Sequence, residues 1–104
     1  MIVVFEKDSL KELFEKGSCA DRRYRFQSHV VKKYCLRVET LQNAPNIEAL
    51  YPLKSLNFEN LSGKKKGISS IRIDLKYRLE FTVEHDQETL ITICNIQDIS
   101  NHYE

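Results

Sequence analysis

The sequence lacks the cysteine pattern of a disulfide-bonded or zinc-binding protein. Its three cysteines, Cys19, Cys35 and Cys94, are odd in number and include no closely spaced pair. Disulfide frameworks use an even number of cysteines, and structural zinc sites use closely spaced pairs. We therefore expect neither a disulfide nor a metal, and a reducing cytoplasm as the location. Cys35 and Cys94 fall within apolar patterns, which predicts that they are small core residues.

Long apolar runs and a strong net charge are also missing. No stretch approaches the roughly 20 apolar residues of a membrane-spanning helix. The opening run Ile2–Phe5 is too short for a signal peptide. The formal net charge of the 104 residues is only +1, too small for a general attraction to anionic surfaces. Because the chain also contains no repeat or low-complexity linker, we expect one cytoplasmic domain over residues 1–104 with no membrane partner.

Positive charge is nevertheless concentrated in one part of the chain. Between Lys64 and Glu80, basic residues far outnumber the acidic Asp74 and Glu80; they are Lys64, Lys65, Lys66, Arg72, Lys76 and Arg78. A local excess of one sign on a nearly neutral chain indicates an anionic partner that binds one face of the protein.

The same part of the chain carries the pattern of a β-hairpin. Apolar and polar residues alternate on both sides of a turn near Leu75, with Ile71, Ile73, Tyr77, Leu79, Phe81 and Val83 as the apolar set. This period of two predicts one buried face and one solvent-exposed face. Arg72 and Arg78 then share the exposed face, nearly opposite each other. Like charges in that position repel unless an anion lies between them, so this pair is our leading functional candidate.

Two helices are predicted upstream of this hairpin. A capping box from Ser9 to Glu12 predicts the start of a short helix that ends at Gly17. A longer helix is predicted by one apolar stripe formed by Val30, Val31, Tyr34, Cys35, Val38 and Leu41. Its N-cap is Ser28, or the helix begins nearer Asp21; it ends before Pro45, with one further helical turn in the segment 46–51.

The order of these elements predicts an α+β fold. Ile2–Phe5 reads as a first strand, and residues 90–96 read as a last strand that is apolar on both faces and therefore central in a sheet. A strand, two helices and then three strands indicate a mostly antiparallel four-stranded sheet. The N-terminal strand and the two helices are expected to pack on one face of this sheet. The other face would be free to bind.

The chain resembles the HigB-like toxins of the RelE/ParE superfamily of type II toxin–antitoxin systems. The resemblance covers nearly the whole length, in order, and its most specific part is Ser-Ile-Arg-Ile at 70–73 followed by Tyr-Arg-Leu-Glu-Phe at 77–81. The other matching stretches are Ile2–Phe5, the long helix ending at Ala44, Leu61–Gly63, and a last strand closing on a histidine. The resemblance implies the RelE/ParE-like fold.

The activity implied by this resemblance is that of a ribosome-dependent mRNA endoribonuclease that inhibits translation. Its substrate would be mRNA in the ribosomal A site, with ribosomal RNA around it, and the reaction would need no metal or other cofactor. The implied partner is a helix-turn-helix, HigA-like antitoxin. Operator DNA would be contacted only through that antitoxin.

The resemblance also assigns roles to individual residues. Arg72 and Arg78 would hold the scissile phosphate, and His102 would act as general acid or base. RNA-binding roles fall to Lys64, Lys65, Lys66, Lys76 and Tyr103. Metal-free RNA cleavage needs positive charge at the phosphate and proton transfer at the attacking and leaving oxygens. The sequence departs from the family by Ser62, where a lysine is common, and by the spacing of Asp98, His102 and Tyr103 at the end of the chain.

Other interpretations stay open at this point. The same fold would suit a ParE-like inhibitor of DNA gyrase without nuclease activity, or an inactive relative that only binds its antitoxin. The segment 22–26 is either an RNA-binding surface or, as we favour, a helix entry that docks Tyr24 and Phe26 into the core. Glu80 is a base, an orienting group for an arginine, or, most simply, a cross-strand ion-pair partner.

Overall fold

The computed structural model describes residues 1–101, and its five strands form a single sheet. The strand order is β1-β5-β4-β3-β2, in which β1 is parallel to β5 and every other neighbouring pair is antiparallel. The strands are β1 (Ile2–Phe5), β2 (Glu59–Asn60), β3 (Ser69–Arg72), β4 (Tyr77–His85) and β5 (Thr92–Asn101). The predicted α+β fold is confirmed, with one strand more than expected because two residues before the basic loop pair with β3 as β2.

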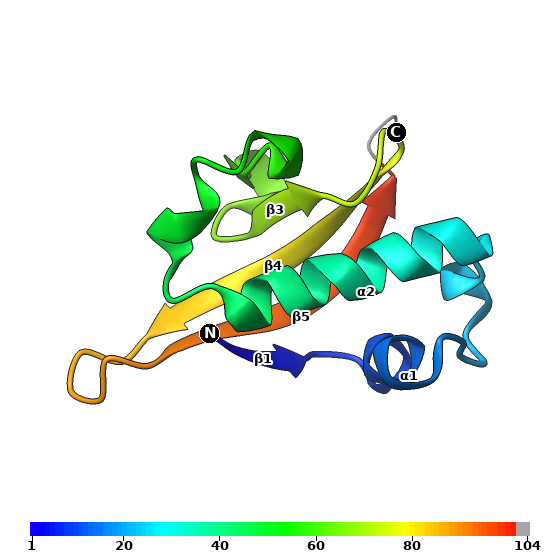
Figure 1. Cartoon of the computed structure of the whole chain (residues 1–104), viewed down its shortest axis with the longest axis horizontal. Helices are drawn as coiled ribbons and strands as arrows, with labels where there is room; N and C mark the ends of the chain where they lie inside the picture. Colours follow the sequence, from blue (N-terminus) through cyan, green and yellow to red (C-terminus); the bar gives the residue numbers. More distant parts are fainter. Residues whose placement is uncertain (102–104) are drawn as a thin grey trace.

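The helices pack on one face of this sheet. Figure 1 shows α2 (Ser28–Asn43) lying across β4 and β5, with the shorter α1 (Asp8–Lys16) beside it. Their apolar side chains form one cluster with those of the sheet; its fully buried members include Leu10, Leu13, Tyr34, Val38, Leu41, Ile71, Ile73, Leu79, Phe81, Cys94 and Ile96. Neither helix is long and apolar enough to cross a membrane, and no other helix within residues 1–101 is.

Short 3₁₀ turns connect these elements, namely η1 (Arg22–Tyr24), η2 (Ile47–Leu50), η3 (Lys54–Leu56) and η4 (Gly63–Lys65). Tyr24 is buried, and the ring of Phe26 packs edge-on against Tyr77 with 4.8 Å between centroids. The favoured reading of segment 22–26 as a helix entry docked into the core is therefore confirmed. The further helical turn is also confirmed as η2, where the Asn46 side chain accepts a hydrogen bond from the Ala49 amide.

The predicted helix starts were less accurate than the helix ends. The prediction of a capping box with Ser9 as N-cap was wrong. The N-cap is Lys7, α1 begins at Asp8, and Ser9 lies inside the helix. The Lys7 carbonyl accepts the first helical hydrogen bonds, and the Asp8 charge in the first turn suits the positive end of the helix dipole. Gly17 ends α1 as predicted, with φ of 76° and its amide bonded to Leu13. In α2 the N-cap is Gln27, one residue before the expected Ser28.

Strand β5 lies inside the sheet between β1 and β4, as predicted for a strand that is not at an edge, but it is longer than the apolar pattern indicated. It begins at Thr92 and continues to Asn101. A register shift pairs Glu80 with Asp98 but Phe81 with Ile96, so Gln97 is the extra residue of a β-bulge. Beyond the bulge, Ser100 pairs with Arg78. The end of the described chain therefore lies beside the hairpin arginine.

Candidate functional site

A groove of about 340 Å³ lies on the face of the sheet opposite the helices. Ile71, Leu79 and Phe81 point toward the helices and are fully buried, so the alternate residues of β3 and β4 point to the other face. The groove is lined by Glu59, Leu61, Ser62, Lys65, Ser70, Arg78, Glu80, Ser100 and Asn101. It therefore combines two cations, two carboxylates and three serine hydroxyls on one surface.

The guanidinium of Arg78 is fixed at the floor of this groove. Arg78 is only 4% exposed. Its Nε donates to the Ser70 hydroxyl, and its Nη2 donates to the backbone carbonyls of Ser70 and Asn57. Nη1 is buried and has no hydrogen-bond partner among residues 1–101. A guanidinium held by two of its nitrogens keeps a fixed orientation, and one nitrogen remains unused.

The expectation that Arg78 and Glu80 lie on a solvent-exposed face was wrong. Both side chains are buried, and so is Ser70, which lies on β3 between β2 and β4. The reason is that the segment before β3 covers this face of the hairpin: the Asn57 carbonyl reaches Arg78, and the Lys65 side chain reaches Glu80. Alternation shows which side chains share a face, but it does not show what packs on that face.

Arg72 lies directly opposite Arg78 in the hairpin, as predicted. The Arg72 side chain is half-buried and makes no hydrogen bond or ion pair with another residue in the described part of the chain, although its carbonyl accepts from Arg37 Nε at 2.8 Å. Burial lowers the pKa of Arg78 below its ordinary value, and the Arg72 charge lowers it further, whereas Glu59 and Glu80 oppose this. Arginine stays protonated in any case, so two positive charges adjoin on this face.

Of the three predicted RNA-binding lysines of the basic loop, only Lys65 lines the groove. Its Nζ lies 2.7 Å from Oε2 of Glu80, an ion pair between a half-exposed lysine and a buried carboxylate. Glu80 is thus an ion-pair partner, but its partner is in the loop and not across the strands, where it faces Ser70 and Asp98. Lys64 and Lys66 are exposed.

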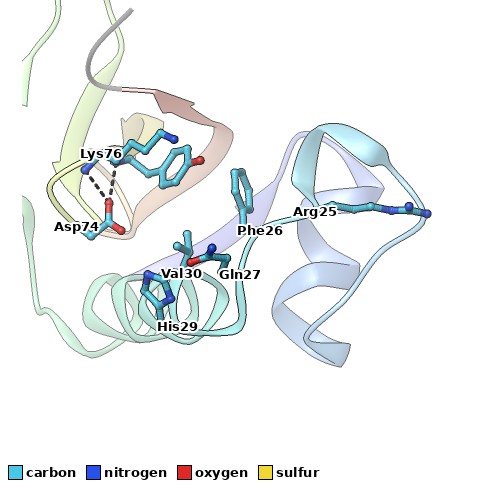
Figure 2. Close-up of a pocket in the computed structure, with 8 residues that line it drawn as sticks. Arg25, Phe26, Gln27, His29, Val30, Asp74 and Lys76 are labelled. Atoms are coloured by element: carbon cyan, nitrogen blue, oxygen red, sulfur yellow. Dashed lines mark hydrogen bonds between the residues drawn. The ribbon is translucent and has the colours of Figure 1, made fainter.

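Lys76 lies outside the groove, at a second cavity of about 230 Å³ between the start of α2 and the hairpin turn. Figure 2 shows this cavity, with the Arg25 side chain pointing away from it. Asp74 Oδ1 accepts hydrogen bonds from the backbone amides of Lys76 and Tyr77, at 2.8 Å each, and these bonds fix the turn. The Lys76 ammonium lies 5.4 Å from the centre of the Tyr77 ring. The structure therefore places Lys76 and Lys65 at different cavities.

The remaining predicted site residues, His102 and Tyr103, lie outside the described residues. The sequence did not point to the groove residues Ser70, Glu59, Ser100 and Asn101, nor to the Asn57 carbonyl that holds Arg78. The sequence pattern could have identified Ser70, because it lies two residues before Arg72 and therefore on the same face of the strand. No pattern could have identified Asn57, since a backbone carbonyl is independent of residue type.

No three His, Cys, Asp or Glu side chains within residues 1–101 form a cluster that could hold a metal ion. The chemistry available in the groove comes from its own side chains. Arginine and lysine can neutralise and orient phosphate oxygens. A carboxylate can accept a proton from a hydroxyl. Such a set suits an anionic ligand that carries hydroxyl groups.

A second polar network holds the end of β5 beside the groove. The Tyr24 hydroxyl donates to Asp98 Oδ1 at 2.6 Å and accepts from Lys7 Nζ at 2.9 Å. The Ile99 amide also donates to Asp98 Oδ1, at 2.9 Å. Burial and the bond to Asp98 raise the pKa of Tyr24, and the bond to Tyr24 raises the pKa of Lys7. The network joins the start of α1, η1 and β5.

We expect Asp98→Ala to lower the free energy of unfolding by about 1–2 kcal/mol at pH 7, because Tyr24 and the Ile99 amide lose their acceptor. The Lys7–Asp98 pair adds little because both side chains are partly exposed. Urea unfolding measures the change. Folding raises the pKa values of Tyr24 and Lys7. The contribution of this network to stability is therefore present below pH 10 and is lost as the pH rises through the two raised pKa values. In a double-mutant cycle with Tyr24→Phe, strictly additive losses of unfolding free energy would contradict the network.

Several solved structures share this fold. The YoeB/ParE toxin from Agrobacterium tumefaciens superposes with a TM-score of 0.60 at 18% identity, covering 99% of this chain and 100% of that one. A conserved hypothetical protein from Helicobacter pylori gives a TM-score of 0.56 at 18% identity, over 100% and 97% of the two chains. YafQ from E. coli strain BL21(DE3) gives 0.52 at 9% identity, over 97% and 92%. At these identities the likeness establishes the fold alone.

The sequence itself identifies the family. Comparison with curated proteins gives no significant match. The family profile of the RelE-like toxin of the type II toxin–antitoxin system HigB matches residues 3–95, which include both hairpin arginines and the basic loop. The resemblance found in the sequence, the fold and this match agree. The chain belongs to the HigB-like family of RelE-like toxins from type II toxin–antitoxin systems.

Proposed function

We propose that this protein is a ribosome-dependent mRNA endoribonuclease that arrests translation in the cytoplasm. RelE-like toxins are generally endoribonucleases, and membership of a toxin–antitoxin family implies an antitoxin partner. The observation that carries the proposal is the fixed guanidinium of Arg78, directly opposite Arg72 and next to Lys65. Two cations in the groove, with Arg72 next to Arg78 across the strands, suit a polyanion with closely spaced phosphates.

In the proposed reaction, the ribose 2′-hydroxyl attacks the adjacent phosphorus, and the bond from phosphorus to the 5′-oxygen breaks. The products are a 2′,3′-cyclic phosphate and a free 5′-hydroxyl. Arg72 and Arg78 stabilise the extra negative charge of the five-coordinate phosphorus, since preorganised donors act most strongly where charge develops. His102 protonates the leaving 5′-oxygen, because an unperturbed imidazole titrates near cytoplasmic pH.

The proton of the 2′-hydroxyl goes to a carboxylate of the groove in this proposal. Glu59 is the better candidate than Glu80, because Glu80 is committed to Lys65 whereas Glu59 is exposed at the edge of the groove. Lys64 and Lys66, both exposed, would contact ribosomal RNA. Lys76 and Tyr103 would add further contacts to the mRNA. A helix-turn-helix antitoxin would block this surface and alone contact operator DNA.

The proposal is tested by expressing the chain from a tightly controlled promoter, with and without a neighbouring helix-turn-helix gene. We expect growth arrest that the second gene relieves, with cuts in the coding regions of translated mRNA. Purified protein should cut a short mRNA on programmed ribosomes, and the same mRNA without ribosomes should stay intact. Intact mRNA together with DNA damage signalling would instead support a gyrase inhibitor. Unimpaired growth would support an inactive relative.

A further inference from the structure

The ion pair between Lys65 and Glu80 is unusual in its setting, because one partner is buried at the floor of the groove and the other comes from a surface loop. The side chain of Glu80 is 6% exposed and that of Lys65 is 52% exposed. Glu80 makes no other ion pair or side-chain hydrogen bond within the described residues. Burial of a carboxylate costs free energy that a single ion pair offsets only in part. Stability alone therefore gives little reason for a glutamate here.

The backbone of the loop is built to bring Lys65 to this position. The loop turns at Gly63 and Gly67, whose φ values of 66° and 92° favour glycine. Between them, the amides of Lys65 and Lys66 bond to Ser62 and Gly63. The loop is closed at its base by the Leu61 amide, which donates to the Ile68 carbonyl at 2.8 Å. Of three consecutive lysines, this geometry directs one into the groove and leaves its two neighbours exposed.

An ammonium group has three donors, and Glu80 takes one of them. The other two remain available to an incoming anion, since half of the Lys65 side chain is exposed. A free lysine side chain loses on the order of 2 kcal/mol of rotamer entropy when it is fixed. In this protein the ion pair has already fixed it. A phosphate that enters the groove thus meets an ordered ammonium on one side and the ordered guanidinium of Arg78 on the other.

We propose that Glu80 is a positioning residue, which holds the Lys65 ammonium over the groove so that an RNA phosphate meets Lys65 and Arg78 at a fixed spacing. The inference rests on the proposed function, because it takes RNA as the ligand. It assigns Glu80 a role opposite to the one its charge suggests. A carboxylate in a phosphate site normally repels the ligand, whereas here its removal weakens binding.

The test compares Glu80→Gln with Glu84→Gln. Glu84 lies four residues further along β4, on the same face and exposed, with no ion pair within the described residues. Each substitution removes one negative charge, so both raise the net charge of the protein by one. We expect Glu80→Gln to weaken binding of a single-stranded RNA oligonucleotide with 2′-O-methyl ribose, which cannot be cut, by about 3- to 10-fold. Glu84→Gln should leave the affinity unchanged or raise it slightly, because added positive charge favours RNA.

Two further measurements separate positioning from a purely structural role. On a Lys65→Met background, Glu80→Gln should cause no additional loss of affinity, because the side chain that it positions is gone. Amide hydrogen exchange of residues 63–67 should quicken in Glu80→Gln while β4 and β5 stay protected. Lys65→Met changes a half-exposed loop residue, so it remains informative even if Glu80→Gln folds poorly.

The outcomes for this inference and for the proposed function differ. Wild-type protein that cuts mRNA on ribosomes, together with a Glu80→Gln variant that binds RNA as tightly or more tightly, overturns the inference alone. Wild-type protein that neither binds the oligonucleotide nor cuts mRNA overturns both. Equal losses from Glu80→Gln with and without Lys65 would also overturn the positioning role.

Discussion

Replacing Arg78 with lysine is expected to lower mRNA cleavage on ribosomes by roughly 10²- to 10³-fold, the usual effect of removing one charge-stabilising donor group from an active site. Lysine keeps the charge and the aliphatic stem, but it cannot reproduce the planar set of donors that reaches Ser70, Asn57 and the groove at once. Single-turnover cleavage of a short mRNA on programmed ribosomes measures the loss. Circular dichroism and urea unfolding check that the variant is folded.

The matched control is Arg22→Lys, which makes the same chemical change at an exposed arginine that does not line the groove and should keep full activity. Arg78→Ala is a poor substitute for Arg78→Lys. It leaves the buried Ser70 hydroxyl and the Asn57 carbonyl without their donor, and we expect it to lower the free energy of unfolding by about 2–4 kcal/mol. A folded Arg78→Lys protein that cuts mRNA at the wild-type rate would remove Arg78 from the mechanism.

The relative positions of the two hairpin arginines could be predicted from the sequence because they depend on local geometry alone. Side chains alternate along a strand, and a short turn fixes which residues face each other. Arg72 and Arg78 were placed opposite each other on this basis, and they pair in the structure. The same reasoning placed Ile71 and Leu79 on the buried face. The apolar residues of the last strand placed it inside the sheet, where it lies between β1 and β4.

The burial of Arg78 could not be predicted in this way, because it depends on a segment distant in sequence. The guanidinium is held by a carbonyl at Asn57, where the chain adopts a left-handed conformation with φ of 44°. Any residue supplies a carbonyl, so no residue pattern marks this contact. The selection of Lys65 over its neighbours likewise depends on how the loop turns at Gly63 and Gly67. The sequence indicates a basic loop, but only the folded backbone distinguishes one lysine from the next.

The length of β5 was underestimated for a related reason. The apolar pattern ends at Ile96, and residues beyond it alternate less clearly. The bulge at Gln97 shifts the register, so that Asp98 and Ser100 continue to pair with β4. Bulges break the simple alternation on which strand prediction depends. Beyond the bulge the end of β5 lies at the groove, where Ser100 and Asn101 form part of the lining.

Stability at alkaline pH is expected to depend on the thiol of Cys94. Cys94 is the third residue of β5 and is fully buried. Burial raises the pKa of this thiol from 9.0 to about 11. Because the pKa of the thiol is higher in the folded protein than in the unfolded chain, its contribution to stability is complete below pH 9. This contribution is lost as the pH rises toward 11. Urea unfolding from pH 8 to pH 11 should show a loss of about 2 kcal/mol from this group.

Cys94→Ala removes the titration and leaves a small cavity, which costs about 1 kcal/mol at neutral pH. The stability curves of the variant and the wild type should therefore cross near pH 10, above which the variant is the more stable protein. Other groups lose stability in the same range, including the buried Tyr34, whose pKa is raised by burial. They titrate equally in both proteins, so the difference between the curves isolates Cys94. Cys19→Ala, which keeps Cys94, should decline in parallel with the wild type. If the Cys94→Ala curve also stayed parallel to the wild-type curve from pH 8 to pH 11, the buried thiol would not be the group that titrates.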